Sequence, residues 1–554
     1  MTRPGRIVHS TAALATAALL AGCGGGGGDG GTSSAGGSGS AGVSTPTAGS
    51  TANCSLRYSL TSLPPQGSGT DPLLAQQWHL QAGGANAVAA WPSGRGEGVR
   101  VAVVDDAVET VHEDLGPNAA AGASYNYLDG SANPLPCTAD DDHGTSVAGL
   151  LAARDGNGLG GAGVAPRASL AGFNALATGT DADTADGQTR GLAANAVVNN
   201  SWGSPDDGAL HPVSSTWRQA IDTGTRSGRG GLGAVYMTSA GNGGLIQIPR
   251  ADGGVNTVAD ADNSNFDGHV SVLGVNAVCA VDRNGRAPFY AEPGTNVLVC
   301  GPSSGNAGDV TTTAIRNGYR SDFSGTSAAS PIAAGVAALV LQARPDLTWR
   351  DVRLILAQSA RQNDPSNASW LPSALPGKRY STTYGYGTVD ARAAVDLAAR
   401  WSSVGGSSTL RSCGPYSRAP NLAIADAGGT AAAPVPGAPA VDSVVVGGAG
   451  APCGLSQIEF VSVTFASDHT YSADLAISLV SPVGLTSALA TTRACGAGLS
   501  AATNPCRSVY RDFPFASVRH LGEPSDGAWQ LRVVDGAPTD RGTLQRWSLT
   551  LWGR

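Results

Sequence analysis

Charged residues are scarce in this sequence, and it contains no long run of lysine or arginine. Asp, Glu, Lys and Arg together account for 14% of the 554 residues, and the formal net charge is −8. Proteins that bind nucleic acid usually cluster basic residues on one face, so we expect no nucleic-acid partner. General disorder is also excluded, because a hydrophobic fraction of 41% suits a globular chain long enough for about two or three domains.

The N-terminal apolar stretch "TAALATAALLA" is too short to cross a bilayer. Arg3 and Arg6 precede it, a pattern typical of a signal peptide over residues 1–22. The stretch ends in "LAGC", which resembles a bacterial lipobox and implies cleavage before Cys23 and lipid attachment to its sulfur. An ordinary signal peptide with a chance cysteine is the alternative. We therefore expect an exported protein that is lipid-anchored to the bacterial envelope, with the outer membrane favoured and the cell surface or periplasm as alternatives.

The sequence has no CxxC pair of the kind that binds zinc. Without Cys23, eight of the nine cysteines remain, and an even number in an exported protein predicts disulfides. The sequence does not fix the connectivity. Proximity along the chain suggests Cys279–Cys300, Cys413–Cys453 and Cys495–Cys506, which leaves Cys54–Cys137.

Changes in composition divide the chain into a tether and two folded domains. Residues 23–65 are rich in glycine and serine and are expected to form a flexible tether. Between residues 66 and 405, apolar strand-like runs alternate with helical patterns, which predicts an α/β domain whose mostly parallel sheet is flanked by helices. Over residues 406–554 the period changes to two in "FVSVTF", "LAISLV", "WQLRVV" and "WSLTLW", which predicts an all-β sandwich.

Three segments of the α/β domain carry the residue types of nucleophilic catalysis. Asp105 ends a valine-rich strand, His143 opens a helix of small residues, and Ser327 opens another helix. Acyl transfer needs an alcohol, a base that takes its proton, and a carboxylate that fixes the tautomer of the base. A serine at a helix N-terminus also lies beside free backbone N–H groups that can stabilise an oxyanion. The segment "TSAGNGG" adds Asn242 as a side-chain donor to the same oxyanion.

Taken alone, each segment has an ordinary explanation as a loop carboxylate, a helix cap or close helix packing. Their combination and order, Asp then His then Ser, match the subtilisin type of triad. The chain resembles the subtilase clan, and more narrowly the kexin/furin proprotein convertases, in "TDPLLAQQWHL", "SWGSPDDG", "GNGG" and "YGYGTVDARAAV". Two further stretches, "ADLAISLVSPVG" and "GAWQLRVVDGAPTDRGTLQRWSLTLWG", resemble the P domain of that branch, a jelly-roll-like sandwich that buttresses the catalytic domain.

The resemblance implies acidic pockets for basic substrate residues. Asp106 and Asp140 match the carboxylates around the second residue before the scissile bond, and strand alternation is expected to point Asp105 and Asp106 to opposite sides. Asp206 and Asp267 match the carboxylates around the residue immediately before that bond, although "SPDDG" is also a good turn. A cation in such a slot gains charge-assisted hydrogen bonds. An exposed strand edge that pairs with the substrate backbone is expected at Ser201, Trp202 and Gly203.

The resemblance also implies calcium, a hard cation that needs several oxygen ligands. One matching set consists of Asp71, Asp114 and Asn157, together with backbone carbonyls of "RDGNGLGG". A second set consists of Asp206, Asp262 and Glu292. Solvated surface acids are the alternative explanation for both sets.

These observations predict a calcium-dependent serine endopeptidase that cleaves proteins or peptides after basic, especially paired basic, residues. Ser327 would attack, His143 would carry the proton, Asp105 would orient His143, and Asn242 would bind the oxyanion. The alternatives are a broad-specificity subtilase whose acids serve only calcium, and a catalytically inactive adhesion or binding protein. Because the stretch from 23 to 71 has no room for a propeptide domain, we expect a separate folding chaperone or inhibitor as a partner.

Overall fold

The computed structural model describes residues 54–58, 67–249, 255–259, 261–305, 307–448, 453–493, 504 and 506–554. The expected signal peptide, the expected lipid attachment site Cys23 and most of the expected tether lie outside these residues, and so does Cys495. The domain boundaries near residues 65 and 405 remain predictions.

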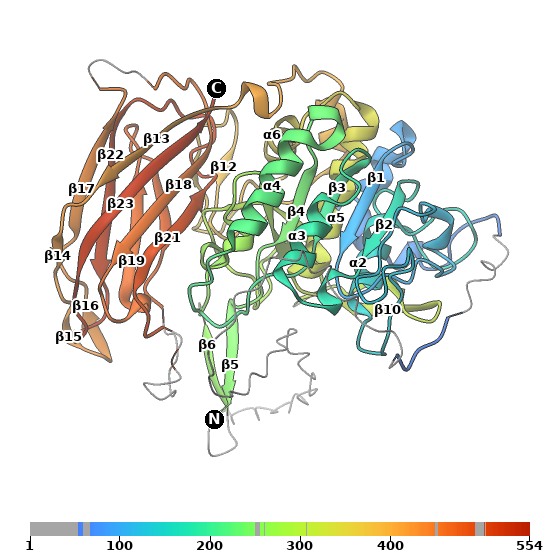
Figure 1. Cartoon of the computed structure of the whole chain (residues 1–554), viewed down its shortest axis with the longest axis horizontal. Coiled ribbons are helices and arrows are strands. Elements are labelled where there is room, and N and C mark those ends of the chain that lie inside the picture. Colours follow the sequence, from blue (N-terminus) through green and yellow to red (C-terminus); the bar gives the residue numbers. More distant parts are fainter. Residues whose placement is uncertain are drawn as a thin grey trace, which may run out of the picture. The chain divides into compact units, whose positions relative to one another are not determined.

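A six-stranded sheet lies at the centre of the N-terminal domain, with the strand order β2-β1-β3-β4-β7-β8 (Figure 1). Every neighbouring pair of strands is parallel. Nearly all residues of these strands are buried, as expected for a parallel sheet covered on both faces. The predicted α/β architecture is confirmed. The strands are β1 (Arg100–Val104), β2 (Ser169–Phe173), β3 (Asn195–Asn200), β4 (Val235–Ser239), β7 (Val275–Val281) and β8 (Val297–Pro302).

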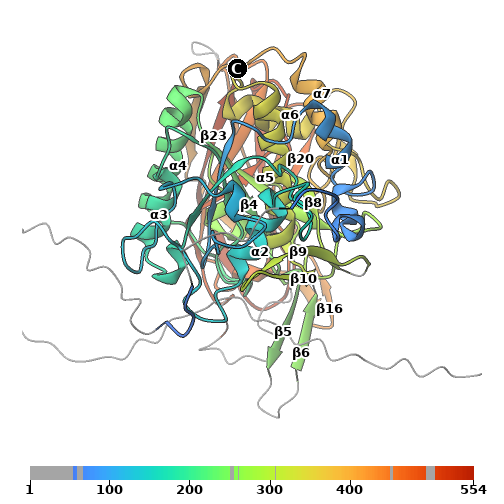
Figure 2. The same ribbon diagram turned by 90° about the vertical axis from the view of Figure 1, so that its right-hand side faces the viewer.

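Helices cover both faces of this sheet. They are α1 (Ala87–Ala90), α2 (His143–Ala152), α3 (Asp181–Thr189), α4 (Ser215–Ser227), α5 (Thr326–Ala343), α6 (Trp349–Ser359) and α7 (Ala391–Ala398). Figure 2 shows α3 and α4 across the central strands from α5. Val101 and Val103 of β1 belong to the core that includes α5, whereas Ala102 and Val104 belong to the core that includes α4. By length and composition α5 could span a membrane, but 83% of it is buried, which is typical of a core helix.

The α/β domain also contains short antiparallel ribbons outside the central sheet. They are β5 (Leu245–Pro249) with β6 (Val255–Ala259), β9 (Val310–Ala314) with β10 (Gly318–Phe323), and β11 (Leu371–Pro372) with β12 (Arg379–Tyr380). In Figure 1 the β5–β6 ribbon extends away from the sheet, and it directly follows the "GNGG" segment in the sequence.

The C-terminal domain is an antiparallel β-sandwich. One sheet has the order β13-β23-β18-β21 with β14 beside β23, and the other has the order β17-β22-β19-β20 (Figure 1). The bounds are β13 (Arg411–Arg418), β14 (Leu422–Ile424), β15 (Gly428–Thr430), β16 (Ala433–Val435), β17 (Ala440–Val446), β18 (Ile458–Ser467), β19 (Leu475–Val480), β20 (Thr486–Ala490), β21 (Tyr510–Ser517), β22 (Gly527–Asp535) and β23 (Gly542–Gly553). The predicted alternation is confirmed, because one core contains Val461, Val463, Phe465, Leu475, Ile477, Leu479, Trp529, Leu531, Val533, Trp547, Leu549 and Leu551.

Buried polar contacts join the sandwich to the α/β domain. Arg350 of α6 binds Glu459 of β18 through two hydrogen bonds, of 2.8 and 2.6 Å. Arg493, which follows β20, donates to the carbonyl of Gly208 at 2.7 Å and stacks over the ring of Phe266. Because buried polar groups are costly unless paired, these contacts fix the seam between the two domains.

Three of the predicted disulfides are present, namely Cys54–Cys137, Cys279–Cys300 and Cys413–Cys453. Cys506 is also disulfide-bonded, and its predicted partner Cys495 lies outside the described residues. These pairings fit an exported protein.

Candidate active site

The carboxylate of Asp105 and the ring of His143 form a hydrogen-bonded pair. β1 ends at Val104, so Asp105 stands just beyond the strand and is fully buried, while His143 is the first residue of α2. Nδ1 of His143 lies 2.8 Å from Oδ1 of Asp105. Because a carboxylate only accepts hydrogen bonds, Nδ1 carries the proton, and Nε2 is the basic nitrogen of the neutral ring.

The surroundings of His143 favour its charged form. Burial of the ring lowers its pKa, but the charge of Asp105, the hydrogen bond to it and the charge of Asp106 outweigh burial and raise the pKa to about 9. Phe323 packs edge-on against the ring, with 5.3 Å between centroids. Sequence reasoning missed Phe323, although it lies in the same "DFSGTS" segment as Ser327. The site therefore stabilises the imidazolium that forms when the ring accepts a proton.

Asp106 caps the helix that carries His143. Its Oδ2 accepts the N–H of His143 at 3.1 Å, and its Oδ1 accepts the N–H of Gly144 at 2.8 Å. Burial, and then the charge of Asp105, raises the pKa of Asp106 to about 8. The expectation that Asp105 and Asp106 point to opposite sides is wrong, because β1 ends at Val104 and both side chains turn toward α2.

Asp140, the predicted partner of Asp106 in a substrate pocket, is exposed. Its backbone N–H donates to Thr138, but no hydrogen bond or ion pair connects the Asp140 carboxylate to another described residue. The structure does not join Asp140 to Asp106, whose own carboxylate is occupied by the helix N-terminus. The pocket assigned to these two residues remains a prediction.

Ser327 lies in the first turn of α5, one residue after the helix begins. Its hydroxyl donates to the carbonyl of Ser201 at 3.0 Å, and the hydroxyl of Ser201 donates to the carbonyl of Ser327 at 2.9 Å. This reciprocal pair ties the end of β3 to the start of α5. Within the described residues, no hydrogen bond joins Ser327 to His143. Catalytic hydrogen bonds often form only when substrate is bound, so this conformation is compatible with a triad.

Asn242 is held with its amide NH₂ group available to an oxyanion. Its Oδ1 accepts the backbone N–H of Thr326 at 2.8 Å and the Thr326 hydroxyl at 3.0 Å, which fixes the orientation of the amide. Gly325 has a φ of 79°. A Cβ atom on Gly325 would lie 3.5 Å from both Nδ2 of Asn242 and the backbone nitrogen of Ser327. Two donors therefore border the space that glycine leaves open.

The segment 201–203 does not form the expected strand edge. β3 ends at Asn200, and the chain beyond it is irregular because Ser201 is tied to α5 and the indole of Trp202 donates to the carbonyl of Val104 at 2.8 Å. Ser201 is buried, Trp202 is half-buried and Gly203 is exposed. The exposed backbone at Gly203 can still pair with an extended peptide.

Asp267 lies against this segment as a fixed anion. Its Oδ1 accepts the hydroxyl of Ser204 and the backbone N–H of His269, at 2.9 and 2.8 Å, and lies 2.9 Å from Nδ1 of His269. Its Oδ2 accepts the N–H of Ser204 at 2.9 Å and faces Gly203, where any side chain would collide with it. Burial raises the pKa of Asp267, but the charge and hydrogen bonds of His269 lower it to about 2. Sequence reasoning missed Ser204, although it lies inside the "SWGSPDDG" motif, and it missed His269, which lies two residues after Asp267.

Asp206, Asp262 and Glu292 gather around the backbone of the "GNGG" segment. Asp206 accepts the N–H of Asn242 at 3.3 Å, and Glu292 accepts the N–H of Gly243 at 2.7 Å. Burial raises the pKa of Asp262 to about 7, and burial together with the charges of Asp262 and Asp206 raises that of Glu292. Within the described residues, no lysine or arginine forms an ion pair with any of the three. Three carboxyl groups gathered at one place suit a divalent cation.

The other predicted calcium ligands also lie together. Asp71 accepts the backbone N–H groups of Gly156 and Asn157 at 2.8 and 3.1 Å. Asp114 accepts the side-chain amide of Asn157 at 2.8 Å, and burial raises the pKa of Asp114 to about 7. Asp71, Asp114 and Asn157 are all buried. Two buried carboxylates match the ligand preference of calcium, whereas the Asn157 amide turns its NH₂ group to Asp114 and its oxygen accepts the N–H of Leu159 at 3.0 Å.

The two domains match two different protein-family models. A family model described as "Subtilase family" matches residues 96–387, and one described as "Proprotein convertase P-domain" matches residues 458–551. The first match contains the Asp105–His143 pair, Asn242 and Ser327, and the second covers most of the sandwich.

Curated relatives match across both domains. The "Dibasic-processing endoprotease" of Schizosaccharomyces pombe is 33% identical over 495 residues, which cover 87% of this chain and 65% of that protein. "Furin" of Homo sapiens is 30% identical over 497 residues, which cover 87% of this chain and 58% of that protein. The chain thus spans less than two thirds of the length of these relatives.

Solved structures share the two-domain fold. The serine protease of Aeromonas sobria matches with a TM-score of 0.73 and 26% identity, over 92% of this chain and 100% of that chain. A second structure shows the same protease in complex with a chaperone, ORF2, and matches with a TM-score of 0.71 and 25% identity over 89% and 96% of the two chains.

Proposed function

Because the chain belongs to the subtilase family and joins its catalytic domain to a proprotein convertase P domain, as the sequence motifs predict, we propose that it is a serine endopeptidase. The observation that carries the proposal is the Asp105–His143 hydrogen bond, together with Ser327 in the first turn of α5 and an oriented Asn242. A binding protein has no need of such a pair beside a helix-borne serine.

The proposed reaction proceeds through an acyl-enzyme. Oγ of Ser327 attacks the scissile carbonyl while Nε2 of His143 takes its proton, and Asp105 holds the ring and stabilises its positive charge. The oxyanion accepts hydrogen bonds from Nδ2 of Asn242 and the backbone N–H of Ser327. His143 then protonates the leaving amine, and water activated by the same ring releases the acyl group.

We further propose that the enzyme cleaves after basic, especially paired basic, residues. Asp267 stays ionised beside Gly203, and Asp206 lies exposed next to Asn242, so a cationic side chain before the scissile bond would meet two carboxylates. The name of the fission-yeast relative supports paired basic sites. A broad-specificity peptidase remains the competing proposal, in which these acids serve only calcium.

A panel of fluorogenic peptides that differ only at the two residues before the cleaved bond tests both proposals. We expect peptides with Arg or Lys there to be cleaved with a kcat/KM at least about 100-fold above alanine peptides, because neutral side chains leave the carboxylates without a partner. Asp267→Asn should reduce this preference, whereas Asp222→Asn, on the exposed face of α4, should leave it unchanged.

The control for the panel is Ser327→Ala, which must be inactive on every peptide. Equal cleavage of basic and neutral peptides would favour the broad-specificity enzyme. An absence of cleavage by the wild-type protein, folded and supplied with calcium, would favour a binding protein.

We propose calcium as the cofactor, held at two sites by Asp71, Asp114 and Asn157, and by Asp206, Asp262 and Glu292. When bound, it would neutralise these carboxylates and stabilise the loops that carry them. The second set lies beside Asn242 and Gly243, so its neutralisation would help to hold the oxyanion donor in place.

Removal of calcium is expected to lower both activity and stability. At a free calcium concentration about 100 times Kd, each site adds about 2.7 kcal/mol to the free energy of unfolding, which a chelator removes. Differential scanning calorimetry of the Ser327→Ala protein measures this loss, and calcium but not magnesium should reverse it. Glu292→Gln should shift the calcium concentration needed, and a chelator without effect on the unfolding temperature would contradict the proposal.

Two proposed partners rest on different observations. A separate folding chaperone is supported by the structure of the Aeromonas sobria protease in complex with one. Anchoring to the bacterial envelope is supported by the sequence "LAGC", in which Cys23 would carry the lipid.

A further inference from the structure

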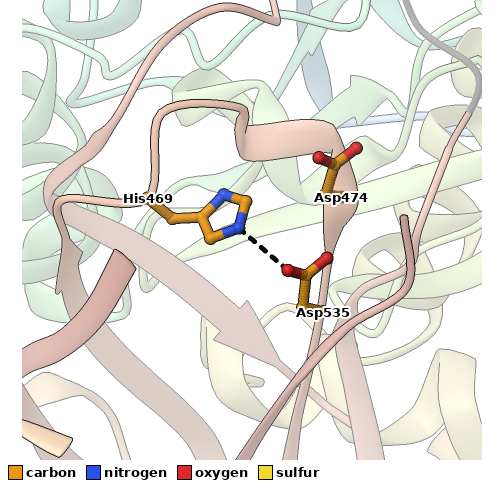
Figure 3. Close-up of side chains that lie close together, drawn as sticks. All are labelled: His469, Asp474 and Asp535. Carbon is orange, nitrogen blue, oxygen red and sulfur yellow. Dashed lines mark hydrogen bonds and ion pairs between the residues drawn. The ribbon is translucent and has the colours of Figure 1, made fainter. Parts of the chain in front are cut away.

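Three ionisable side chains converge at one end of the sandwich, away from the candidate active site in sequence. His469 lies two residues beyond β18, Asp474 immediately precedes β19, and Asp535 is the last residue of β22. One ligand atom from each lies within 4.8 Å of the others (Figure 3). All three residues are buried, with Asp474 the most exposed at 7%.

The hydrogen bonds of His469 aim a lone pair into this cluster. Nδ1 lies 3.1 Å from the carbonyl oxygen of Tyr471, which can only accept, so Nδ1 carries the proton. The longer contact, 3.4 Å from the N–H of Tyr471 to the same nitrogen, is the weaker one. Nε2 then faces Oδ2 of Asp535 at 3.2 Å, as the dashed line in Figure 3 marks. Two acceptors at this distance repel each other unless a cation lies between them.

A cation would also stabilise the two carboxylates. Oδ1 of Asp535 accepts the N–H of Ala537 at 3.1 Å, which leaves Oδ2 to the cluster. The side chain of Asp474 accepts no hydrogen bond from a described residue, although it is more than nine-tenths buried. A buried carboxylate without a donor is costly, and a second carboxylate beside it adds to the cost.

From this geometry we propose that His469, Asp474 and Asp535 bind a divalent transition-metal cation of the zinc type. Ligands about 2.0–2.1 Å from a tetrahedral zinc are roughly 3.3 Å apart, close to the Nε2–Oδ2 distance. The Nδ1–H bond to a backbone carbonyl is the usual outer contact of a metal-bound histidine. A ring nitrogen selects such a cation over calcium, which prefers oxygen. This site does not depend on the proposed peptidase activity.

A bound cation would also stabilise the contacts between the sandwich and the α/β domain. The carbonyl of Ala473, next to Asp474, accepts the backbone N–H of Arg493 at 2.9 Å. The side chain of Arg493 reaches the carbonyl of Gly208, and the N–H of Gly208 donates to Asp262 at 2.8 Å. The cation would thus fix the segment that supports Arg493.

Zinc titration of the full-length protein, freed of transition metals, tests the proposal. The protein carries His143→Ala, which removes the histidine of the candidate active site, and is kept in saturating calcium. We expect one equivalent of Zn²⁺ to bind by isothermal titration calorimetry and to raise the unfolding temperature. Substitution by Co²⁺ should give the visible absorption bands of a bound, low-coordinate ion.

Asp474→Asn is the decisive variant, because it keeps the side-chain volume and removes one ligand charge. We expect it to weaken zinc binding by more than the roughly 10- to 100-fold cost of losing an outer contact, and to raise the unfolding temperature of the zinc-free protein by relieving repulsion with Asp535. Asp540→Asn is the matched control, since it removes a nearby charge that is paired with Thr470 and should leave zinc binding intact.

Three outcomes would overturn the proposal. Zinc binding that survives Asp474→Asn places the ion elsewhere. Equal weakening of zinc binding by Asp474→Asn and Asp540→Asn indicates that negative charge attracts the ion in general and that Asp474 does not coordinate it. No response to zinc at all, in the presence or absence of calcium, leaves a protonated His469 ring as the cation between the carboxylates.

Discussion

Asp105→Asn is expected to lower kcat on a basic fluorogenic peptide by roughly 10,000-fold while changing KM little. Asparagine keeps the shape of the buried side chain, but it removes the charge that stabilises the imidazolium of His143. Its single amide oxygen can still accept the Nδ1–H bond that Oδ1 of Asp105 accepts at 2.8 Å, so the lost negative charge is the main effect. The loss therefore falls on the transition state and not on substrate binding.

The pH profile separates this explanation from simple misfolding. Asp105 raises the pKa of His143, whereas burial lowers it. Without the carboxylate of Asp105 the pKa of His143 falls, so the acidic limb of kcat/KM should move to lower pH while the maximum falls. If kcat/KM of the variant fell by the same factor at all pH values and its unfolding temperature also fell, this account would be contradicted.

Asp106→Asn is the matched control for Asp105→Asn. It removes the adjacent carboxylate and replaces one of the two oxygens that accept N–H groups of α2 by an NH₂ group, but it leaves the Asp105–His143 bond in place. We expect a far smaller loss of kcat. Equal losses in the two variants would show that the charge of the pair, and not the charge of Asp105 in particular, supports the reaction.

Glu459→Gln is expected to lower the free energy of unfolding by about 3–5 kcal/mol. Glu459 is the acidic partner of Arg350, and their side chains are 3% and 0% exposed. The remaining contacts of Arg350 are to neutral groups, among them the carbonyl of Gly406 at 3.0 Å. Glutamine would therefore leave a buried guanidinium without a counterion, which is more costly than the loss of a hydrogen bond alone.

Urea unfolding in the Ser327→Ala background measures this effect without self-digestion. The sandwich offers a matched pair in Arg546 and Asp512, which is bidentate but about half exposed. Asp512→Asn should cost less than about 1 kcal/mol, because water screens that pair. A similar small cost for Glu459→Gln would show that the seam between the domains contributes little to stability.

Local patterns predicted elements of this fold and pointed to its candidate catalytic residues. The alternation of Val461, Val463 and Phe465 marked a buried strand face, and the helix predicted at His143 begins at that residue. The direction of Asp106 was mispredicted, since alternation holds only within a strand and β1 ends two residues earlier.

Contacts between distant segments could not be predicted from local patterns. Arg350 and Glu459 are 109 residues apart, and nothing near either residue marks it as half of a buried ion pair. The same holds for His469 and Asp535, which are 66 residues apart. Only the folded topology brings the ends of β18 and β22 together.

The peptide backbone of Gly208 limits how this protein can diverge or be recombined. Its carbonyl is bound by Arg493 from one domain, while its N–H is committed to Asp262 in the other. An insertion or deletion in this loop would displace both contacts at once, so the loop can tolerate substitutions more readily than changes in length. A chimera that joins this catalytic domain to a foreign sandwich would therefore need an arginine equivalent to Arg493, whatever else the replacement sequence carries.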